Sequence, residues 1–95
     1  MMSVRESVRQ ADGPLVYIIK RFPEFWGQIR RLAEEKKFFD LCRDYADAVE
    51  LCRYWQEQGE PGALERAQDY TTMATELEAE ILREIIASGN LTTER

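Results

Sequence analysis

Two long helical patterns separated by one break constrain the fold of this 95-residue chain more than any other feature. Apolar residues recur at spacings of three and four over residues 38–58 and again over residues 61–88. The break reads Gln-Gly-Glu-Pro-Gly at residues 58–62, where Gly59 suits the end of one helix and Pro61 the first turn of the next. Two such helices joined by a short turn predict a long antiparallel hairpin.

A third apolar stripe precedes the hairpin and predicts an N-terminal helix over about residues 23–35. Phe-Pro-Glu at residues 22–24 is typical of a helix start, because proline fits the first helical position. The stripe consists of Phe22, Phe25, Ile29 and Leu32. It loses its phase in Glu-Glu-Lys-Lys at residues 34–37, so we expect a bend or a short loop near residues 35–38. No glycine or proline marks this point, which keeps one continuous helix as the alternative.

The segment Leu-Val-Tyr-Ile-Ile at residues 15–19 supports two interpretations. Its β-branched residues favour a strand. A single strand, however, has no partner in a helical chain of this size except in an oligomer. We expect a short helix or an extended segment that packs on the bundle.

Together these patterns predict an all-α fold, in which a long antiparallel helical hairpin plus an N-terminal helix form a small three-helix bundle-like domain. The single helical domain is expected at residues 14–90, with helices at about 23–35, 38–58 and 61–88. A mobile arm at residues 1–13 precedes it. A frayed tail at residues 91–95 follows, because Gly89 is typical of a helix stop.

The unequal lengths of the two hairpin helices leave an apolar end without a cover. With the turn centred near residue 60, Phe38 lies opposite about residue 82. The projecting end carries Ile81, Leu82, Ile85 and Ile86. Either the stripe at residues 22–32 or a second subunit must cover it. A chain this short also has a thin core, for which oligomerisation is a common remedy.

Charge is distributed unevenly along the chain, whose net charge at pH 7 is −5. Residues 1–37 carry eight basic and five acidic residues, whereas residues 38–95 carry five basic and thirteen acidic ones. The two parts can attract each other within the fold. Otherwise the basic part offers a face to an acidic partner or supports head-to-tail association. The acidic balance argues against non-specific nucleic-acid binding as the main role.

No membrane attachment is expected from the sequence. The longest apolar run is the one at residues 15–19, far short of the ~20 residues that a membrane-spanning helix needs. The N-terminal residues are polar and do not resemble a signal peptide. We expect a cytoplasmic protein without a membrane partner.

The residue types that enzyme catalysis uses are poorly represented. Histidine is absent, which removes Ser-His-Asp and Cys-His arrangements and the commonest transition-metal ligand. The five glycines are scattered and form no phosphate-binding loop. Acidic residues line up at Asp40, Asp44 and Asp47 and again at Glu76, Glu80 and Glu84. We interpret both sets as solvated helix faces, and the sequence predicts no enzyme, no catalytic residue, no cofactor and no metal site.

The two cysteines, Cys42 and Cys52, lie within one predicted helix. Ten residues of helix separate their Cα atoms by ~15 Å, which is too far for a disulfide. We expect both to act as buried thiols, which pack like small apolar side chains. A disulfide between subunits is the alternative.

The predicted contact surface combines aromatic residues with the projecting apolar end. Tyr54 and Trp55 are adjacent, so both cannot face one core, and one of them is expected on the surface or in an interface. The candidate interface residues are Trp26, Tyr54, Trp55, Ile81, Leu82, Ile85 and Ile86.

These features favour a non-catalytic helical interaction module that self-associates. We expect a homo-oligomer, with a dimer favoured, and a protein partner as a further option. The first alternative is a regulatory or adaptor protein whose basic N-terminal part docks an acidic partner or nucleic acid. The second is a thiol redox protein.

A recurring frame of residues resembles a known family. The chain carries Phe-Pro-Glu at residues 22–24, Ile29 and Leu32, and then Phe39, Leu41 and Asp-Tyr at residues 44–45. This frame resembles the small uncharacterised bacterial YdcH-like α-helical hairpin family, in which a Leu-x-x-Glu-Ile element similar to residues 77–81 closes the pattern. The resemblance implies a helical hairpin and transfers no activity, because the family has none established.

Overall fold

The fold is that of a computed structural model that describes residues 13–93, with side chains described through residue 89. The elements in chain order are η1 (Gly13–Leu15), α2 (Val16–Arg21), η2 (Pro23–Phe25), α3 (Trp26–Leu32), α4 (Lys36–Gln56) and α5 (Ala63–Thr93). Residues 13–93 contain no strand. The predicted all-α fold is confirmed, whereas the predicted arm falls outside the described residues except for Gly13, which begins η1.

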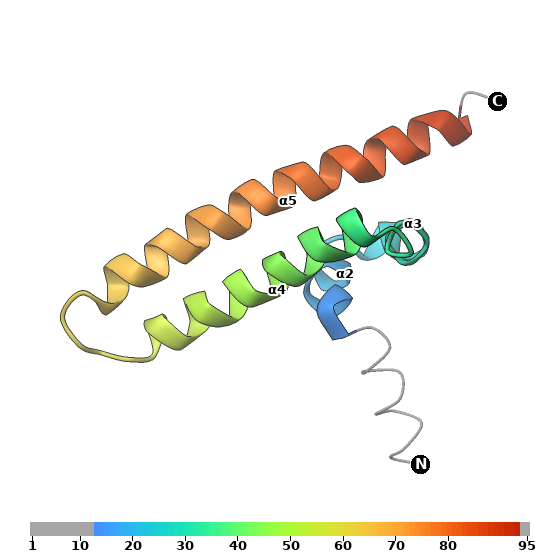
Figure 1. The fold of residues 1–95 in the computed structure, drawn as a ribbon. Helices are drawn as coiled ribbons and strands as arrows, with labels where there is room; N and C mark the ends of the chain where they lie inside the picture. The colour runs from blue at the N-terminus through green and yellow to red at the C-terminus, as the bar shows by residue number, and fades with distance from the viewer. Residues whose placement is uncertain (1–12, 94–95) are drawn as a thin grey trace, which may run out of the picture.

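The two longest helices form the predicted hairpin. Figure 1 shows α4 and α5 running antiparallel along most of their length, joined by one loop. Within that loop, Gly59 and Gly62 adopt φ angles of 74° and 89°, which L-residues with a Cβ avoid. The break at residues 58–62 is therefore where the sequence placed it. The last helix begins at Ala63, two residues later than predicted, so Pro61 belongs to the loop.

A short non-helical segment separates α3 from α4. The first of these helices ends at Leu32 and the second begins at Lys36. Glu35 is extended, with φ −88° and ψ 131°, and this turns the chain from one axis to the other. The expected break is confirmed, although it lies slightly earlier than residues 35–38.

Residues 16–21 form the helix α2, which settles the ambiguity of the apolar run before Phe22. Ile18 is fully buried and Leu15 nearly so, and both belong to the core cluster. Burial against α4 decides the conformation here, because the strand preference of β-branched residues depends strongly on context.

The prediction that Gly89 ends the last helix is wrong, because α5 continues through it to Thr93. The backbone of residues 91–93 in the predicted frayed tail belongs to α5, and the fraying itself stays a prediction. A Cβ atom at Gly89 would lie 3.1 Å from Nε2 of Gln28 in α3. This glycine allows α3 and α5 to approach closely and does not terminate the helix.

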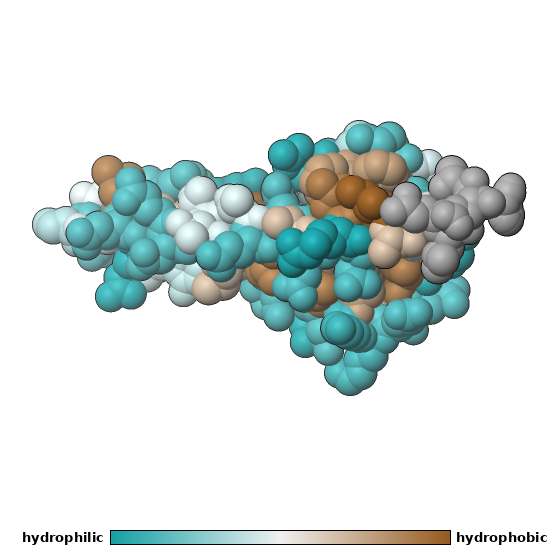
Figure 2. All heavy atoms as spheres, turned by 90° about the horizontal axis from the view of Figure 1, so that it is seen from above, coloured by the Kyte–Doolittle hydropathy of each residue, from teal (hydrophilic) through white to brown (hydrophobic). Residues whose placement is uncertain are grey.

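The hydrophobic core lies at the end of the hairpin away from its loop. Its fully buried side chains are Ile18, Ile29, Cys42, Ile81 and Ile85. They come from α2, α3, α4 and α5, so the N-terminal elements cover the projecting end of α5 within one chain. Seen from above α5, apolar surface gathers over this half of the molecule, and the half near the loop is mostly hydrophilic (Figure 2).

Candidate interaction surface

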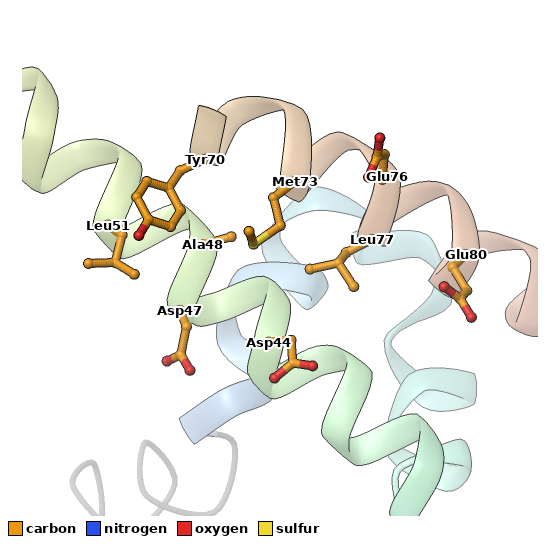
Figure 3. Close-up of a pocket in the computed structure, with 9 residues that line it drawn as sticks. All are labelled: Asp44, Asp47, Ala48, Leu51, Tyr70, Met73, Glu76, Leu77 and Glu80. Carbon is orange, nitrogen blue, oxygen red and sulfur yellow. The ribbon is translucent and has the colours of Figure 1, made fainter. Parts of the chain in front are cut away.

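A groove of about 370 Å³ runs between α4 and α5. Its apolar lining consists of Ala48, Leu51, Tyr70, Met73 and Leu77. Leu51 and Met73 are exposed over 39% and 45% of their surface, so two flexible apolar side chains face solvent there. Figure 3 shows Met73 and Leu77 extending from α5 toward α4, with Leu51 on α4 among the lining residues.

Within the part of the chain that the structure describes, the N-terminal elements leave the groove open, because their core contacts lie on another side of the hairpin. On that side Cys42 joins the core, and the Tyr17 hydroxyl donates a hydrogen bond to Oε2 of Glu50 at 3.0 Å. Successive helical residues rotate by 100°, so Leu51 lies about 180° and Asp47 about 140° around α4 from Cys42, whereas Glu50 borders a neighbouring hollow together with Asp47 and Leu51. The faint ribbons of α2 and α3 lie behind the hairpin in Figure 3.

Four carboxylates border the groove. Asp44 and Asp47 extend from α4, and Glu76 and Glu80 extend from α5. From the sequence, these residues were interpreted as two separate solvated faces. That interpretation did not place them at one groove. A signal was present, because Asp44 and Glu76 are equally distant from Glu60 and antiparallel helices bring such positions together. The result is an apolar floor with an acidic rim.

A hydrogen-bonded junction stabilises the covered side of the hairpin. The Tyr45 hydroxyl donates to Oε2 of Glu78 at 2.5 Å, and Nε of Arg21 donates to the same oxygen at 3.1 Å. Burial, reinforced by the carboxylate of Glu78, raises the pKa of Tyr45 above its ordinary range. Three helices meet at this carboxylate. Arg21 and Glu78 are thus one case of the attraction expected between the basic and acidic parts of the chain.

The two cysteines have different surroundings. Cys42 is completely buried, and its burial raises the pKa of the thiol to about 12. Cys52 is half-buried, with its sulfur 3.1 Å from Oγ1 of Thr71. That hydroxyl donates to the carbonyl of Ala67 at 3.0 Å, so the Cys52 thiol is the donor toward Thr71. Both cysteines are free. Cys42 was expected to be buried and is, whereas Cys52 is only partly so.

The adjacent aromatics near the loop separate as expected. Tyr54 is 52% exposed, whereas Trp55 is half-buried. Their rings meet edge to face with centroids 5.1 Å apart, and the guanidinium of Arg66 lies 5.0 Å from the centre of the Trp55 ring. Tyr54 is therefore the one of the pair that faces solvent.

The remaining candidate interface residues divide between core and surface. Ile81 and Ile85 are fully buried within the single chain and have no surface left for a partner. Leu82 is half-buried, and Ile86 is 48% exposed. Trp26 is 57% exposed at the start of α3, where the guanidinium of Arg30 lies 5.6 Å from the centre of its ring.

Among the described residues, no group of three or more Asp, Glu or Cys side chains is arranged to hold a metal ion. None of the helices in residues 13–93 has the length and apolarity that crossing a membrane requires. No protein-family model, no curated protein and no solved structure matches this chain. The resemblance to the YdcH-like family accordingly stays a prediction.

Proposed function

We propose that this chain is a non-catalytic helical interaction module that self-associates. The observation that carries the proposal is the open groove between α4 and α5, where Leu51 and Met73 face solvent. Burying such side chains against a second polypeptide removes apolar surface from water, which is the main driving force of association. The hairpin that forms the groove packs against α2 and α3 through one buried cluster within the chain.

The reasons for self-association differ from those the sequence suggested. The end of α5 that carries Ile81 and Ile85 is covered within the chain and no longer requires a second subunit. The exposed large apolar side chains of the described residues are Trp26, Leu51, Tyr54, Leu64, Met73 and Ile86, and of these only Ile86 belongs to that end of α5. Scattered exposed residues of this kind are ordinary, but Leu51 and Met73 share one concave site and thus support an interface.

A non-catalytic role is supported by the chemistry of the side chains. The sequence has no histidine to act as a general base or to activate a thiol. The pKa of the Cys42 thiol is raised to about 12, so this cysteine is a poor nucleophile at neutral pH. These observations also weaken the alternative of a thiol redox protein.

The adaptor alternative finds less support in the arrangement of the cations. Docking on an acidic partner or on nucleic acid needs free basic side chains on one face. Arg21 is paired with Glu78, and Lys36 is paired with Asp40 at 3.0 Å. Part of the basic charge is therefore engaged within the chain.

Light scattering coupled to chromatography tests the proposal directly. We expect a mass near twice the 11.2 kDa of one chain at tens of micromolar, falling toward one chain on dilution. A single-chain mass across the whole concentration range would contradict self-association.

A further inference from the structure

We propose that the α3 end of one copy packs into the acidic groove of a second copy, with Trp26 inserted between α4 and α5. This inference rests on the proposed self-association and specifies its interface. Each copy has one such end and one such groove, and both surfaces consist of described residues.

The groove defines the chemistry of its occupant. Its floor of Leu51, Met73 and Leu77 requires an apolar side chain, and its volume of about 370 Å³ admits a large one. Its rim of Asp and Glu residues requires positive charge beside that side chain. The fitting occupant is a large apolar group surrounded by cations.

The α3 end meets these requirements. Trp26 is 57% exposed, which is unusual for the largest apolar side chain. Arg30 lies against its ring, and Arg31 is exposed one residue further along. Residues 13–37 as a whole carry six basic and three acidic residues, and two of the six, Arg21 and Lys36, pair with Glu78 and Asp40 of the same chain. Tryptophan and arginine are also the residue types that contribute most energy to protein interfaces.

A dimer in which the groove of one copy faces the groove of the other is less favourable than one in which Trp26 enters the groove. Such a dimer opposes the carboxylates of Asp44, Asp47, Glu76 and Glu80 on one copy to the same set on the other. Like charges brought together in an interface cost several kcal/mol. The residues from 38 to 93 carry twelve acidic and four basic residues, so the rest of the hairpin does not relieve this repulsion.

Trp26 cannot occupy the groove of its own chain. Ile29 in the same short helix belongs to the buried cluster with Ile81 and Ile85, which fixes α3 on the covered side of the hairpin. The groove opens on another side, in front of α2 and α3 in Figure 3. A second copy must therefore supply the side chain. A two-fold symmetric dimer contains this contact twice, once in each direction.

Charge and aromatic variants of the full chain test the interface by sedimentation velocity. We expect Trp26→Glu to raise the dimer dissociation constant by at least about thirty-fold, the effect of losing a central contact residue. The double variant Asp47→Lys with Glu80→Lys is expected to do the same. The matched controls are Leu64→Glu, an exposed apolar side chain outside the groove lining, and Glu57→Lys with Glu65→Lys, two exposed carboxylates near the loop. Both controls are expected to dimerise like the unaltered chain.

Mixing the two disabling variants tests whether the contact runs between copies. The Trp26→Glu chain keeps an intact groove, and the chain with the two groove lysines keeps an intact Trp26. A mixture is therefore expected to form a mixed dimer that neither variant forms with itself. Unchanged circular dichroism and unfolding midpoints show that the variants remain folded.

Several outcomes would overturn the inference while leaving self-association in place. Dimers that survive both sets of substitutions place the interface elsewhere. A strong mixed dimer between the unaltered chain and the groove-lysine chain, with Trp26→Glu unaffected, indicates groove-against-groove packing. Loss of the dimer on deleting residues 1–12, with Trp26→Glu unaffected, assigns the groove to that segment of a second copy. An unaltered chain that is monomeric throughout contradicts self-association itself.

Discussion

The hydroxyl of Tyr45 in α4 lies 2.5 Å from Oε2 of Glu78 in α5, and Nε of Arg21 in α2 lies 3.1 Å from the same oxygen. One carboxylate thus accepts hydrogen bonds from two other helices. It holds the hairpin closed and also attaches the N-terminal segment to it. The covered side of the hairpin therefore combines the apolar cluster with one polar junction, whereas neither of these lies over the groove among residues 13–93.

Removing the Tyr45 hydroxyl tests this junction. We expect Tyr45→Phe to lower the free energy of unfolding by about 1–3 kcal/mol, because the hydrogen bond is charge-assisted and Tyr45 is buried. Tyr54→Phe removes an exposed hydroxyl and serves as the control, with little expected change. Urea unfolding measures both. Equal effects of the two substitutions would show that the bond to Glu78 contributes nothing specific.

Alkaline pH is expected to destabilise the fold through Cys42 and Tyr45. The pKa of Cys42 is raised by burial from 9.0 to about 12, and the pKa of Tyr45 is raised above 10.0 by burial and by Glu78. Both folded-state values exceed the unfolded ones, so the neutral forms stabilise the fold. This stabilisation is complete below about pH 9 and is lost as pH rises toward 12, with a slope of about 1.4 kcal/mol per pH unit for each group that titrates.

Urea unfolding at a series of pH values from neutral upward measures this loss. Cys42→Ala is expected to flatten the part of the curve that begins near pH 9, while Cys52→Ala is expected to leave it unchanged. A free energy of unfolding that stays constant above pH 9 in the unaltered chain would contradict the account of both buried groups.

The two thiols are expected to differ in reactivity. Cys42 is fully buried with a raised pKa, so a chromogenic thiol reagent should reach it only as fast as the chain unfolds. Cys52 is half-buried beside Thr71 and should react in the folded state. Single-cysteine variants separate the two rates. A fast folded-state reaction of Cys42 would show that the core around it is open.

Two neighbouring isoleucines test the cover that the N-terminal elements provide. Ile85 is fully buried, whereas Ile86 is 48% exposed. We expect Ile85→Ala to cost about 2–5 kcal/mol of unfolding free energy, because it leaves a cavity against α3 and α4. Ile86→Ala changes the same atoms and should cost less than about 1 kcal/mol. Similar losses for both, measured by urea unfolding in dilute solution, would mean that α3 does not cover the end of α5.

Much of this fold could be predicted from the sequence, for local reasons. The loop between the long helices was evident because Gly59 and Gly62 supply backbone conformations that other residues avoid. The stripe that contains Ile29 and the end that contains Ile85 were both visible, and so was the need for a cover. Which of two covers was used depends on tertiary packing, and the structure places Ile29 and Ile85 in one buried cluster.

The features that the sequence could not reveal depend on contacts between elements. Glycine is a residue type that commonly ends helices, which is why Gly89 was interpreted as a stop. Its role is set instead by the close approach of Gln28 from another helix. The acidic groove arises only when two faces, one with Asp47 and one with Glu80, are brought to the same side of the hairpin. Periodicity describes each helix alone, so it showed these faces as solvated and unrelated.

Photo-crosslinking from the groove tests whether Trp26 of one copy occupies the groove of a second copy. A benzophenone side chain placed at Met73 in the groove is expected to give a covalent dimer whose crosslinked peptide contains residues 26–32 of the second copy. The same group at Leu64, which is 69% exposed and outside the groove lining, provides the control and should give no such product. A crosslink from Met73 to residues 63–80 of the second copy, or no covalent dimer at all, would contradict the claim that Trp26 of one copy occupies the groove of another.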